Sequence, residues 1–367
     1  MGMSYLVYPG AHHTRFHHAL GCLYIMQKAL DTLVSKGVEI SNSEREAVQI
    51  AILLHDIGHG PFSHAMEHSI VEDINHEQIS SLFMEALNAK FNGSLTLAIQ
   101  IFKGSYHRPF LHQLVSGQLD MDRTDYLKRD SFYTGMAEGN INTDRIIAML
   151  NVKDDELVVE EKGVYTIEKF LVARRLMYWQ VYLHKTSLAA EQILVRVLKR
   201  AKELTESGIK LPGSKALNYF LSERITRSTF DKEALETFAS LDDYDIISAM
   251  KEWCSNEDFV LSTLSTIIIN RKLPRIKIKK KGFSDEYIQK QVDKVIAKCN
   301  ISEQEARYFV FTGDITNQAY TFQKEGINIL TKKGKIIDVV SASDQLGLKA
   351  LSKVITKNYI CYPKYKD

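Results

Sequence analysis

The sequence predicts a mostly α-helical fold with a small α+β region towards the C-terminus. Long segments place apolar residues at helical spacing, whereas strand-like alternation is confined to short stretches. The 367 residues are 45% hydrophobic and 25% charged, which is the composition of an ordinary globular protein large enough for one large core or two smaller ones. We expect two parts, residues 1–204 and residues 205–367.

Composition excludes several classes of protein. The formal net charge of +2 favours no particular partner, and the four cysteines contain no CxxC pair, so there is no zinc-finger signal and the thiols are expected to be reduced. No apolar run reaches the roughly 18 residues of a membrane span, and there is no signal peptide. We predict a cytoplasmic protein. All 12 histidines lie at or before His184, which places any chemistry in the N-terminal half.

Two helices are predicted before residue 57. The first covers about 13–36 and ends before Gly37, and its apolar residues fall near one face: Phe16, Leu20, Leu23, Leu30 and Val34. Ser41 followed by Glu44 is a capping-box pattern that predicts the start of the second helix. This helix runs to Asp56.

The stretch AILLHDIGHGPFSH, residues 51–64, organises the N-terminal half. An apolar run ends in His55 and Asp56 and breaks at once into a Gly-Pro loop, which puts an imidazole and a carboxylate at the end of a buried helix. Burying these polar groups is costly unless something pairs with them, and a divalent metal is the simplest partner. A nitrogen and an oxygen ligand suit Mn, Fe, Zn, Ni or, less well, Mg. Helices are expected over residues 64–72 and from His76 onward.

Two further segments carry polar side chains on one helical face. Asp122, Tyr126 and Asp130 stand at i, i+4 and i+8 on a helix that Gly135 ends. After a β-hairpin predicted over residues 157–167, turning at Lys162-Gly163, one very long helix is predicted over residues 167–204. Its face carries groups suited to phosphate and base contact, which we favour over a solvated face: Arg174, Tyr178, Tyr182 and Lys185.

The C-terminal part carries no chemical motif that we can name. Residues Arg271–Lys281 hold seven basic residues in eleven positions and alternate like a strand, which is typical of a charged edge strand and is also compatible with weak nucleic-acid contact. A strand is expected near Tyr308–Thr312 and a hairpin over residues 327–340 that turns at Lys333-Gly334. A helix capped by Ser343 follows.

The histidines and aspartates form the pattern H…HD…D, with His18, His55, Asp56 and Asp122 from three predicted helices. Together with the stretches YPGAHHTRFHHALG, LLHDIGHGPFSH, NHEQ and DMDRTDYLKRD, the chain resembles the HD-domain phosphohydrolases, in the branch of the deoxynucleoside triphosphate triphosphohydrolases. The likeness is strong over residues 5–190. It implies an HD-domain helical fold, a homo-oligomer and a divalent ion held by the four residues of the pattern.

The resemblance also implies roles for other residues. Those matching groups near the scissile bond are His64, His76, Glu67 and His59. Those matching substrate-binding groups are Arg15 at the phosphates, Tyr126 and Asp130 at the sugar, and Arg174, Tyr182 and Lys185 on the long helix. In this family water attacks the α-phosphorus of a dNTP, and the products are a deoxynucleoside and inorganic triphosphate. That choice of bond comes from the resemblance alone.

Other hypotheses stay open beside this one. The chain is also compatible with another HD phosphohydrolase, acting on nucleoside monophosphates, cyclic nucleotides or (p)ppGpp, and with a nucleotide- or nucleic-acid-binding regulator of low turnover. His107, His112 and His184 fit hydrogen-bonded core or surface groups. Family members carry a few dozen residues before the YPGA stretch, where only eight residues precede Pro9 here. The start is truncated or misassigned, or the protein lacks that layer, so nucleotide activation and base preference stay open.

Overall fold

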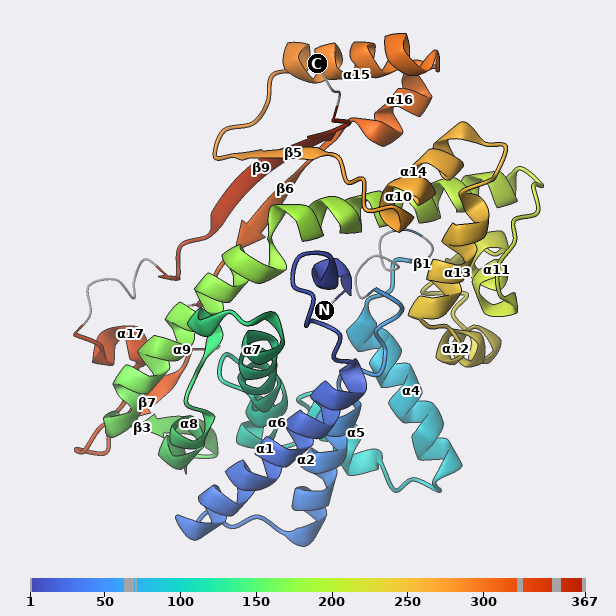
Figure 1. Cartoon of the computed structure of the whole chain (residues 1–367). Coiled ribbons are helices and arrows are strands. Elements are labelled where there is room, and N and C mark those ends of the chain that lie inside the picture. Colours follow the sequence, from blue (N-terminus) through green and yellow to red (C-terminus); the bar gives the residue numbers. More distant parts are fainter. Residues whose placement is uncertain (1, 63–68, 70, 322–325, 345–350, 365–367) are drawn as a thin grey trace.

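The computed structural model describes residues 2–62, 69, 71–321, 326–344 and 351–364 (Figure 1). The fold is mostly helical, as predicted, and has three small sheets. The elements that position the site are η1 (Gly2–Leu6), α1 (Arg15–Ser35), α2 (Asn42–Leu54), β1 (Val71–Glu72), α4 (His76–Lys90), α5 (Thr96–Phe102), α6 (Pro109–Val115), α7 (Met121–Thr134), η2 (Ala137–Gly139), α8 (Thr143–Met149), β2 (Leu150–Lys153), β3 (Glu156–Glu160), η3 (Glu161–Gly163), α9 (Val164–Met177), η4 (Tyr178–Tyr182) and α10 (Lys185–Glu206). The remaining elements are α11 (Lys215–Ser222), β4 (Ile225–Thr226), α12 (Lys232–Ala239), α13 (Asp243–Trp253), α14 (Phe259–Ile269), β5 (Arg275–Lys279), α15 (Asp285–Cys299), α16 (Glu303–Phe309), β6 (Phe311–Asn317), β7 (Asn328–Leu330), β8 (Ile336–Asp338), α17 (Val339–Ala342) and β9 (Ile355–Tyr362).

The N-terminal bundle is built from α1, α2, α5, α6 and α7, which pack around one apolar core. Its boundaries follow local signals: the Ser41–Glu44 capping box is present, and α7 ends at Gly135, whose φ is 73°. The buried face of α1 differs in part from the predicted one: Leu30 is fully buried as predicted, but Phe16, Leu20 and Val34 are exposed. The buried face also includes Cys22, Met26 and Leu33, and α1 packs on α2 and α7.

The long helix expected over residues 167–204 is interrupted. It begins as α9, widens into the π-helix η4 and breaks at Leu183–His184 before α10 starts. The His184 side chain accepts a hydrogen bond from the backbone N–H of Thr186, so this residue caps α10. The break places Tyr178 and Tyr182 on η4 while Lys185 lies beyond it, so these residues do not share one continuous helical face.

The β-hairpin near residue 160 also differs from the prediction. β3 pairs antiparallel with the preceding strand β2, and the turn is formed by Asp154 and Asp155, both with positive φ. Lys162 and Gly163 instead form the short helix η3, which leads into α9. The second predicted hairpin is present as β7 and β8, which are joined across the Lys333-Gly334 turn.

The C-terminal region contains the sheet β5-β9-β6, with α15 and α16 beside it. β5 lies at the edge of this sheet, as expected for the basic run. Residues 308 and 309 belong to α16, so the strand predicted near Tyr308–Thr312 starts only at Phe311. The helix predicted after Ser343 and most of the one predicted over residues 64–72 lie outside the described residues, although Val71 and Glu72 form strand β1.

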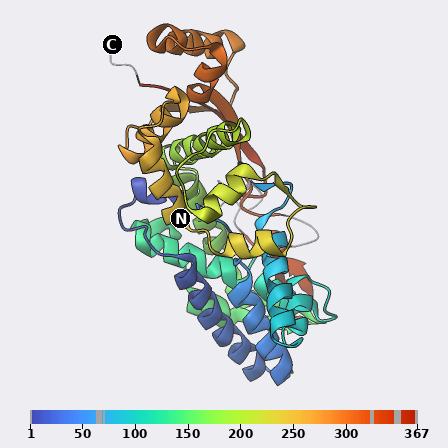
Figure 2. The ribbon, with the colours of Figure 1, turned by 90° about the vertical axis from the view of Figure 1, so that its right-hand side faces the viewer.

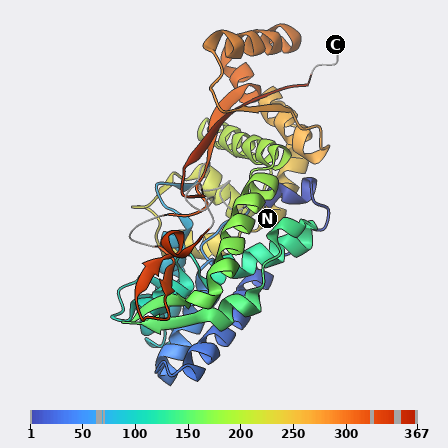
Figure 3. The same cartoon turned by 90° about the vertical axis from the view of Figure 1, so that its left-hand side faces the viewer.

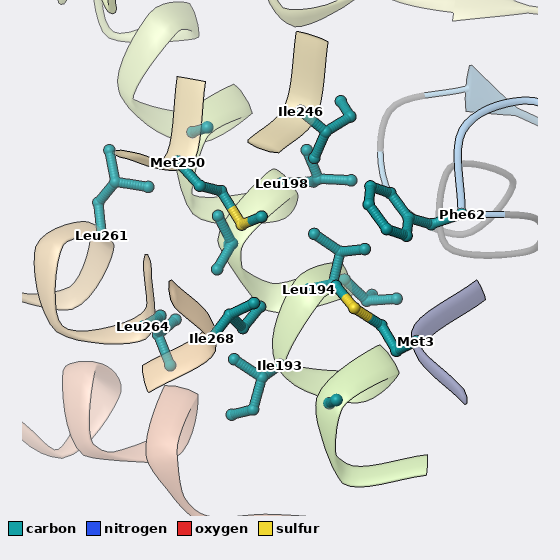
Figure 4. Close-up of a cluster of buried hydrophobic side chains, with 14 of the residues drawn as sticks. Met3, Phe62, Ile193, Leu194, Leu198, Ile246, Met250, Leu261, Leu264 and Ile268 are labelled. Atoms are coloured by element: carbon teal, nitrogen blue, oxygen red, sulfur yellow. The ribbon is translucent and has the colours of Figure 1, made fainter. Parts of the chain in front are cut away.

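Helix α10 lies between the N-terminal bundle at one end of the elongated molecule and α15 and α16 at the other (Figures 1, 2 and 3). A second apolar core surrounds it, in which Ile193, Leu194 and Leu198 meet residues of α13 and α14, and Met3 and Phe62 join from the N-terminal part (Figure 4). Met3 of η1 and Phe62, which follows the Gly-Pro break, therefore pack against the C-terminal half. No described helix has both the length and the apolar character that crossing a membrane requires.

Candidate active site

The site begins where α2 ends. His55 is the C-cap of this helix, and the loop that follows packs closely on α4: a Cβ at Gly58 would lie 2.2 Å from the His76 carbonyl oxygen. The Ser80 hydroxyl donates to the His55 carbonyl at 2.8 Å and accepts from the Gly58 N–H at 2.9 Å. These contacts fix the turn, so His55 and Asp56 point from a rigid helix end.

Four side chains from α1, α2 with its following turn, and α7 converge. His18 Nε2 lies 3.0 Å from Asp122 Oδ1 and 3.8 Å from Asp56 Oδ2. His55 Nε2 lies 3.4 Å from Asp56 Oδ1 and 3.5 Å from Asp122 Oδ1. The structure thus brings together the four residues predicted as metal ligands.

The donor set fits a divalent cation. His55 Nδ1 donates to the Ile52 carbonyl at 2.7 Å, which leaves its Nε2 facing the cluster. That nitrogen is buried and has no hydrogen-bond partner among the described residues. A buried imidazole nitrogen without a hydrogen-bond partner, beside two carboxylates, is available to bind a metal ion. Two imidazoles with two carboxylates suit first-row transition metals.

The imidazoles and carboxylates of the cluster shift one another's pKa values. Burial alone would lower the pKa of His18, but contacts with Asp122 and Asp125 raise it well above its usual value. Burial would likewise lower the pKa of His55, and Asp56 and Asp122 raise it to about 9. Burial would raise the pKa of Asp122, yet the two imidazoles hold it far below its usual range. Both histidines therefore sit in a strongly negative environment that suits a cation.

Cys22 is a further buried group beside the cluster. Its Sγ lies 3.4 Å from His18 Nδ1, and its donor atom falls within 4.8 Å of those of His18, His55 and Asp122. Burial raises the pKa of this thiol to about 12. Asp56 lies close to both imidazoles and is the fourth residue of the predicted ligand set.

A cavity of about 1060 Å³ opens beside the cluster. Its walls come from α1, α4, α7, η4 and the N-terminal turn η1. Arg15 and Arg123 line it near the cluster, and Arg15 Nη1 donates to the Gly60 carbonyl at 3.3 Å. The volume is at the upper end of ordinary ligand pockets.

Part of the cavity wall is aromatic. Tyr126 and Tyr178 each make an edge-on contact with Tyr182, with ring centroids 6.0 and 5.1 Å apart. The Tyr182 hydroxyl donates to Asp130 Oδ2 at 2.7 Å, and His13 Nε2 donates to Asp130 Oδ1 at 2.7 Å. Burial raises the pKa of Tyr182 well above its usual value, so it remains a neutral donor.

The other predicted site residues divide into three groups. His59 and His76 line the cavity and stack with ring centroids 3.8 Å apart, and His59 Nε2 lies 3.7 Å from Asp56 Oδ1. Arg174 and Lys185 are not among the residues that line the cavity: Arg174 is buried and donates to Gln118 Oε1 at 3.2 Å, and Lys185 is exposed. His64 and Glu67 lie outside the described residues.

Three functional candidates were not predicted from the sequence: His13, Asp125 and Arg129. Asp125 Oδ2 lies 2.7 Å from His18 Nδ1, and Arg129 donates to both oxygens of Asp125. The i, i+4 spacing of Asp125 and Arg129 is a signal for an ion pair. The signal does not show that this pair reaches a histidine on another helix. His13 gave no signal beyond its place in a histidine-rich stretch.

Comparison with protein families and known proteins agrees with this geometry. The model of the HD domain matches residues 15–127, which include all four clustered residues. The model of an HD-associated region matches residues 141–211. An uncharacterized protein of Bacillus subtilis, YwfO, is 30% identical, with 99% of this chain and 84% of that protein aligned.

Two further relatives are informative. A solved phosphohydrolase from Bacteroides thetaiotaomicron superposes with a TM-score of 0.95 at 52% identity, over 99% of this chain and 91% of that chain. The SAMHD1 homolog of Dictyostelium discoideum, a deoxynucleoside triphosphate triphosphohydrolase, is 27% identical over 64% of this chain. The chain spans about half the length of that enzyme, 49% of which is aligned.

Proposed function

This chain belongs to the HD-domain phosphohydrolase family, and we propose that it hydrolyses deoxynucleoside triphosphates to a deoxynucleoside and inorganic triphosphate. The observation that carries the proposal is one cavity lined by two chemically different groups of residues. One group is the His18, His55, Asp56 and Asp122 cluster, and the other is three tyrosines with Asp130. The resemblance to triphosphohydrolases supports this substrate class.

The two groups match the parts of a nucleotide. A cationic region with Arg15 and Arg123 suits phosphate oxygens, because guanidinium groups form charge-assisted hydrogen bonds with them. The aromatic wall suits the sugar and base, because tyrosine rings stack on flat or apolar surfaces while their hydroxyls hydrogen-bond. Asp130 offers an acceptor in this group.

The four ligand candidates would hold a divalent ion, which when bound neutralises phosphate charge and makes water more acidic. Hydrolysis at the α-phosphorus forms a bond from the water oxygen to phosphorus and breaks the bond to the 5′-oxygen. That oxygen needs a proton. His59 and His76 line the cavity and are candidates to donate it, while the arginines stabilise charge on the phosphate oxygens.

Product analysis tests the proposal. The protein is loaded with Mn²⁺, Fe²⁺, Mg²⁺ or Ni²⁺ and incubated with each dNTP alone and with all four together, and the products are separated by ion-exchange chromatography. We expect inorganic triphosphate and deoxynucleoside in equal amounts. Orthophosphate or pyrophosphate would assign the protein to another HD branch. Absence of products with every metal and mixture would refute the hydrolase proposal.

A further inference from the structure

An ion pair on α7, between Asp125 and Arg129, lies against His18; Arg129 lines the cavity and Asp125 does not. Asp125 Oδ2 accepts from His18 Nδ1 at 2.7 Å. Arg129 donates to the same carboxylate twice, through Nε at 2.7 Å and Nη2 at 2.9 Å. The Asp125 side chain is only 8% exposed, so its charge has little contact with solvent. The two-point contact fixes the plane of the carboxylate.

A glycine on α1 makes room for this pair. A Cβ at Gly21 would lie 2.0 Å from Arg129 Nη2 and 2.1 Å from Asp125 Oδ1, closer than any real contact. Gly21 lies in the interior of α1, three residues after His18. The pair therefore packs directly against the α1 backbone, and position 21 cannot carry a side chain while the pair keeps this geometry.

We propose that Asp125, held by Arg129 and accommodated by Gly21, is a positioning residue that keeps His18 Nδ1 protonated and turns Nε2 towards Asp56 and Asp122. This inference rests on the metal site of the proposed function. A carboxylate behind a ligand histidine fixes its tautomer and ring orientation and makes it a stronger ligand. Asp125 is not among the residues that line the cavity, so in this proposal it acts only through His18.

The second histidine of the cluster shows that this arrangement is specific to His18. His55 Nδ1 donates to a backbone carbonyl, that of Ile52, which orients the ring without adding a charge. Of the two histidines in the cluster, only His18 has a carboxylate acceptor at Nδ1, that of Asp125. Asp125 in turn forms an ion pair with Arg129. The charge on Asp125 should therefore raise metal affinity beyond what orientation alone supplies.

The test measures metal binding rather than turnover. Metal-free protein is titrated with Mn²⁺, and free Mn²⁺ is followed by its electron paramagnetic resonance signal. We expect Asp125→Asn to weaken binding by about 10- to 100-fold, and Arg129→Gln to weaken it in the same direction by less. The matched control is Asp144→Asn, which removes a surface ion pair between Lys28 of α1 and α8 and should leave the affinity unchanged.

A second measurement needs no variant. In wild-type protein loaded with Zn²⁺, long-range ¹H–¹⁵N correlation spectra report which nitrogen of His18 carries the proton, and we expect Nδ1. This keeps the proposal testable even if Asp125→Asn fails to fold, which circular dichroism of each variant will show.

The outcomes separate the two proposals. Asp122→Ala should abolish Mn²⁺ binding. If it does so while Asp125→Asn and Arg129→Gln bind like wild type, the positioning role is wrong and the metal site stands. A proton on His18 Nε2 would also overturn the positioning role. If wild-type protein binds no divalent ion, both proposals fall.

Discussion

Two histidines near the start of α1 each pair with an aspartate of α7, and the two pairs have different surroundings. His18 pairs with Asp125 beside the cluster of candidate ligands, and His13 pairs with Asp130 beside the tyrosines. Both contacts are 2.7 Å long, and all four side chains are largely buried. The chemistry of a His–Asp pair is therefore not set by the pair itself.

The third partner makes the difference. Asp125 is paired with Arg129, so its charge is balanced and the far nitrogen of His18 is left for a cation. Asp130 accepts from the neutral Tyr182 hydroxyl, and no lysine or arginine forms an ion pair with it among the residues that the structure describes. Under the proposed function, the His18 pair would support a metal and phosphate, and the His13 pair neutral hydroxyl groups and flat rings. The predictions below test this division, from the largest expected effect to the smallest.

Asp122→Ala should abolish function at the metal cluster. The carboxylate is shared by both imidazoles, so its loss removes the centre of the cluster. We expect turnover to fall on the order of 10³-fold or more, since a single preorganised charge-stabilising group is already worth about 10²–10³-fold. Mn²⁺ binding should be lost in parallel, as measured by equilibrium dialysis. Full activity of this variant would refute the ligand assignment.

Asp130→Asn should impair the aromatic group without affecting the metal. The amide keeps the size of the side chain but removes the charge that accepts from His13 and Tyr182. We expect kcat/KM for dNTPs to fall by about 10- to 100-fold, the value of a hydrogen bond to a charged group, with Mn²⁺ affinity unchanged. Steady-state kinetics and metal titration check this. An equal loss in metal affinity would show that the two groups are not separate.

Tyr182→Phe should have a smaller effect of the same kind. The ring and its contacts with Tyr126 and Tyr178 remain, and only the hydroxyl that donates to Asp130 is lost. A single hydrogen bond to a charged group is worth at least about 1.5 kcal/mol, so kcat/KM should fall by roughly 10-fold, the lower end of the range expected for Asp130→Asn. The same substitution in an Asp130→Asn background should cost less than in wild type, because its partner has already changed.

Glu44→Gln should alter stability and leave both groups of cavity residues intact. Burial alone would raise the pKa of Glu44, but hydrogen bonds from Ser41, Arg108 and Tyr106 lower it below its usual value. A lowered carboxyl pKa stabilises the fold above the unfolded-state pKa of about 4.3, and this stabilisation is lost as pH falls through the lower folded-state value. Urea unfolding of metal-free protein should show wild type more stable by about 1–3 kcal/mol at pH 7.

The outcome at acidic pH shows whether the effect of Glu44→Gln comes from charge or from packing. Below about pH 4 the stability difference between wild type and Glu44→Gln should shrink towards zero, because Glu44 becomes protonated. A difference that stays constant between pH 7 and pH 3 would mean that packing, not charge, explains the effect. Metal affinity of the variant at pH 7 should equal that of wild type.

Much of the N-terminal bundle could be predicted because its boundaries are set by short-range chemistry. A serine three residues before a glutamate caps α2, and a glycine in the left-handed region ends α7. The His-Asp pair followed by a Gly-Pro break predicted an imidazole and a carboxylate at the end of a helix, and His55 and Asp56 lie at the end of α2. The helix after residue 164 could not be predicted as well, because nothing local to Tyr178–Tyr182 announces a π-helix.

The rest of the site depends on contacts between helices. Asp125 and Arg129 are an ordinary i, i+4 pair in the sequence, and only the packing of α7 on α1 brings them to His18. Arg174 and Lys185 share helical spacing with Tyr182, yet the break before α10 and the burial of Arg174 keep both from the cavity wall. The hairpin near residue 160 was misplaced because two adjacent aspartates, not Lys-Gly, adopt positive φ.

The small sheet beside α9 has a consequence for how the protein is made. Strand β3 pairs in parallel with β7, so Val158 meets Asn328 across a long stretch of chain. During synthesis the bundle and the β2–β3 hairpin leave the ribosome well before β7 has been made. Until β7 is present, β3 has an unpaired edge. Pairing between segments so distant in sequence is slow to form. The nascent chain is therefore most exposed to aggregation in the interval between these strands, and a chaperone that shields sheet edges would act at that stage.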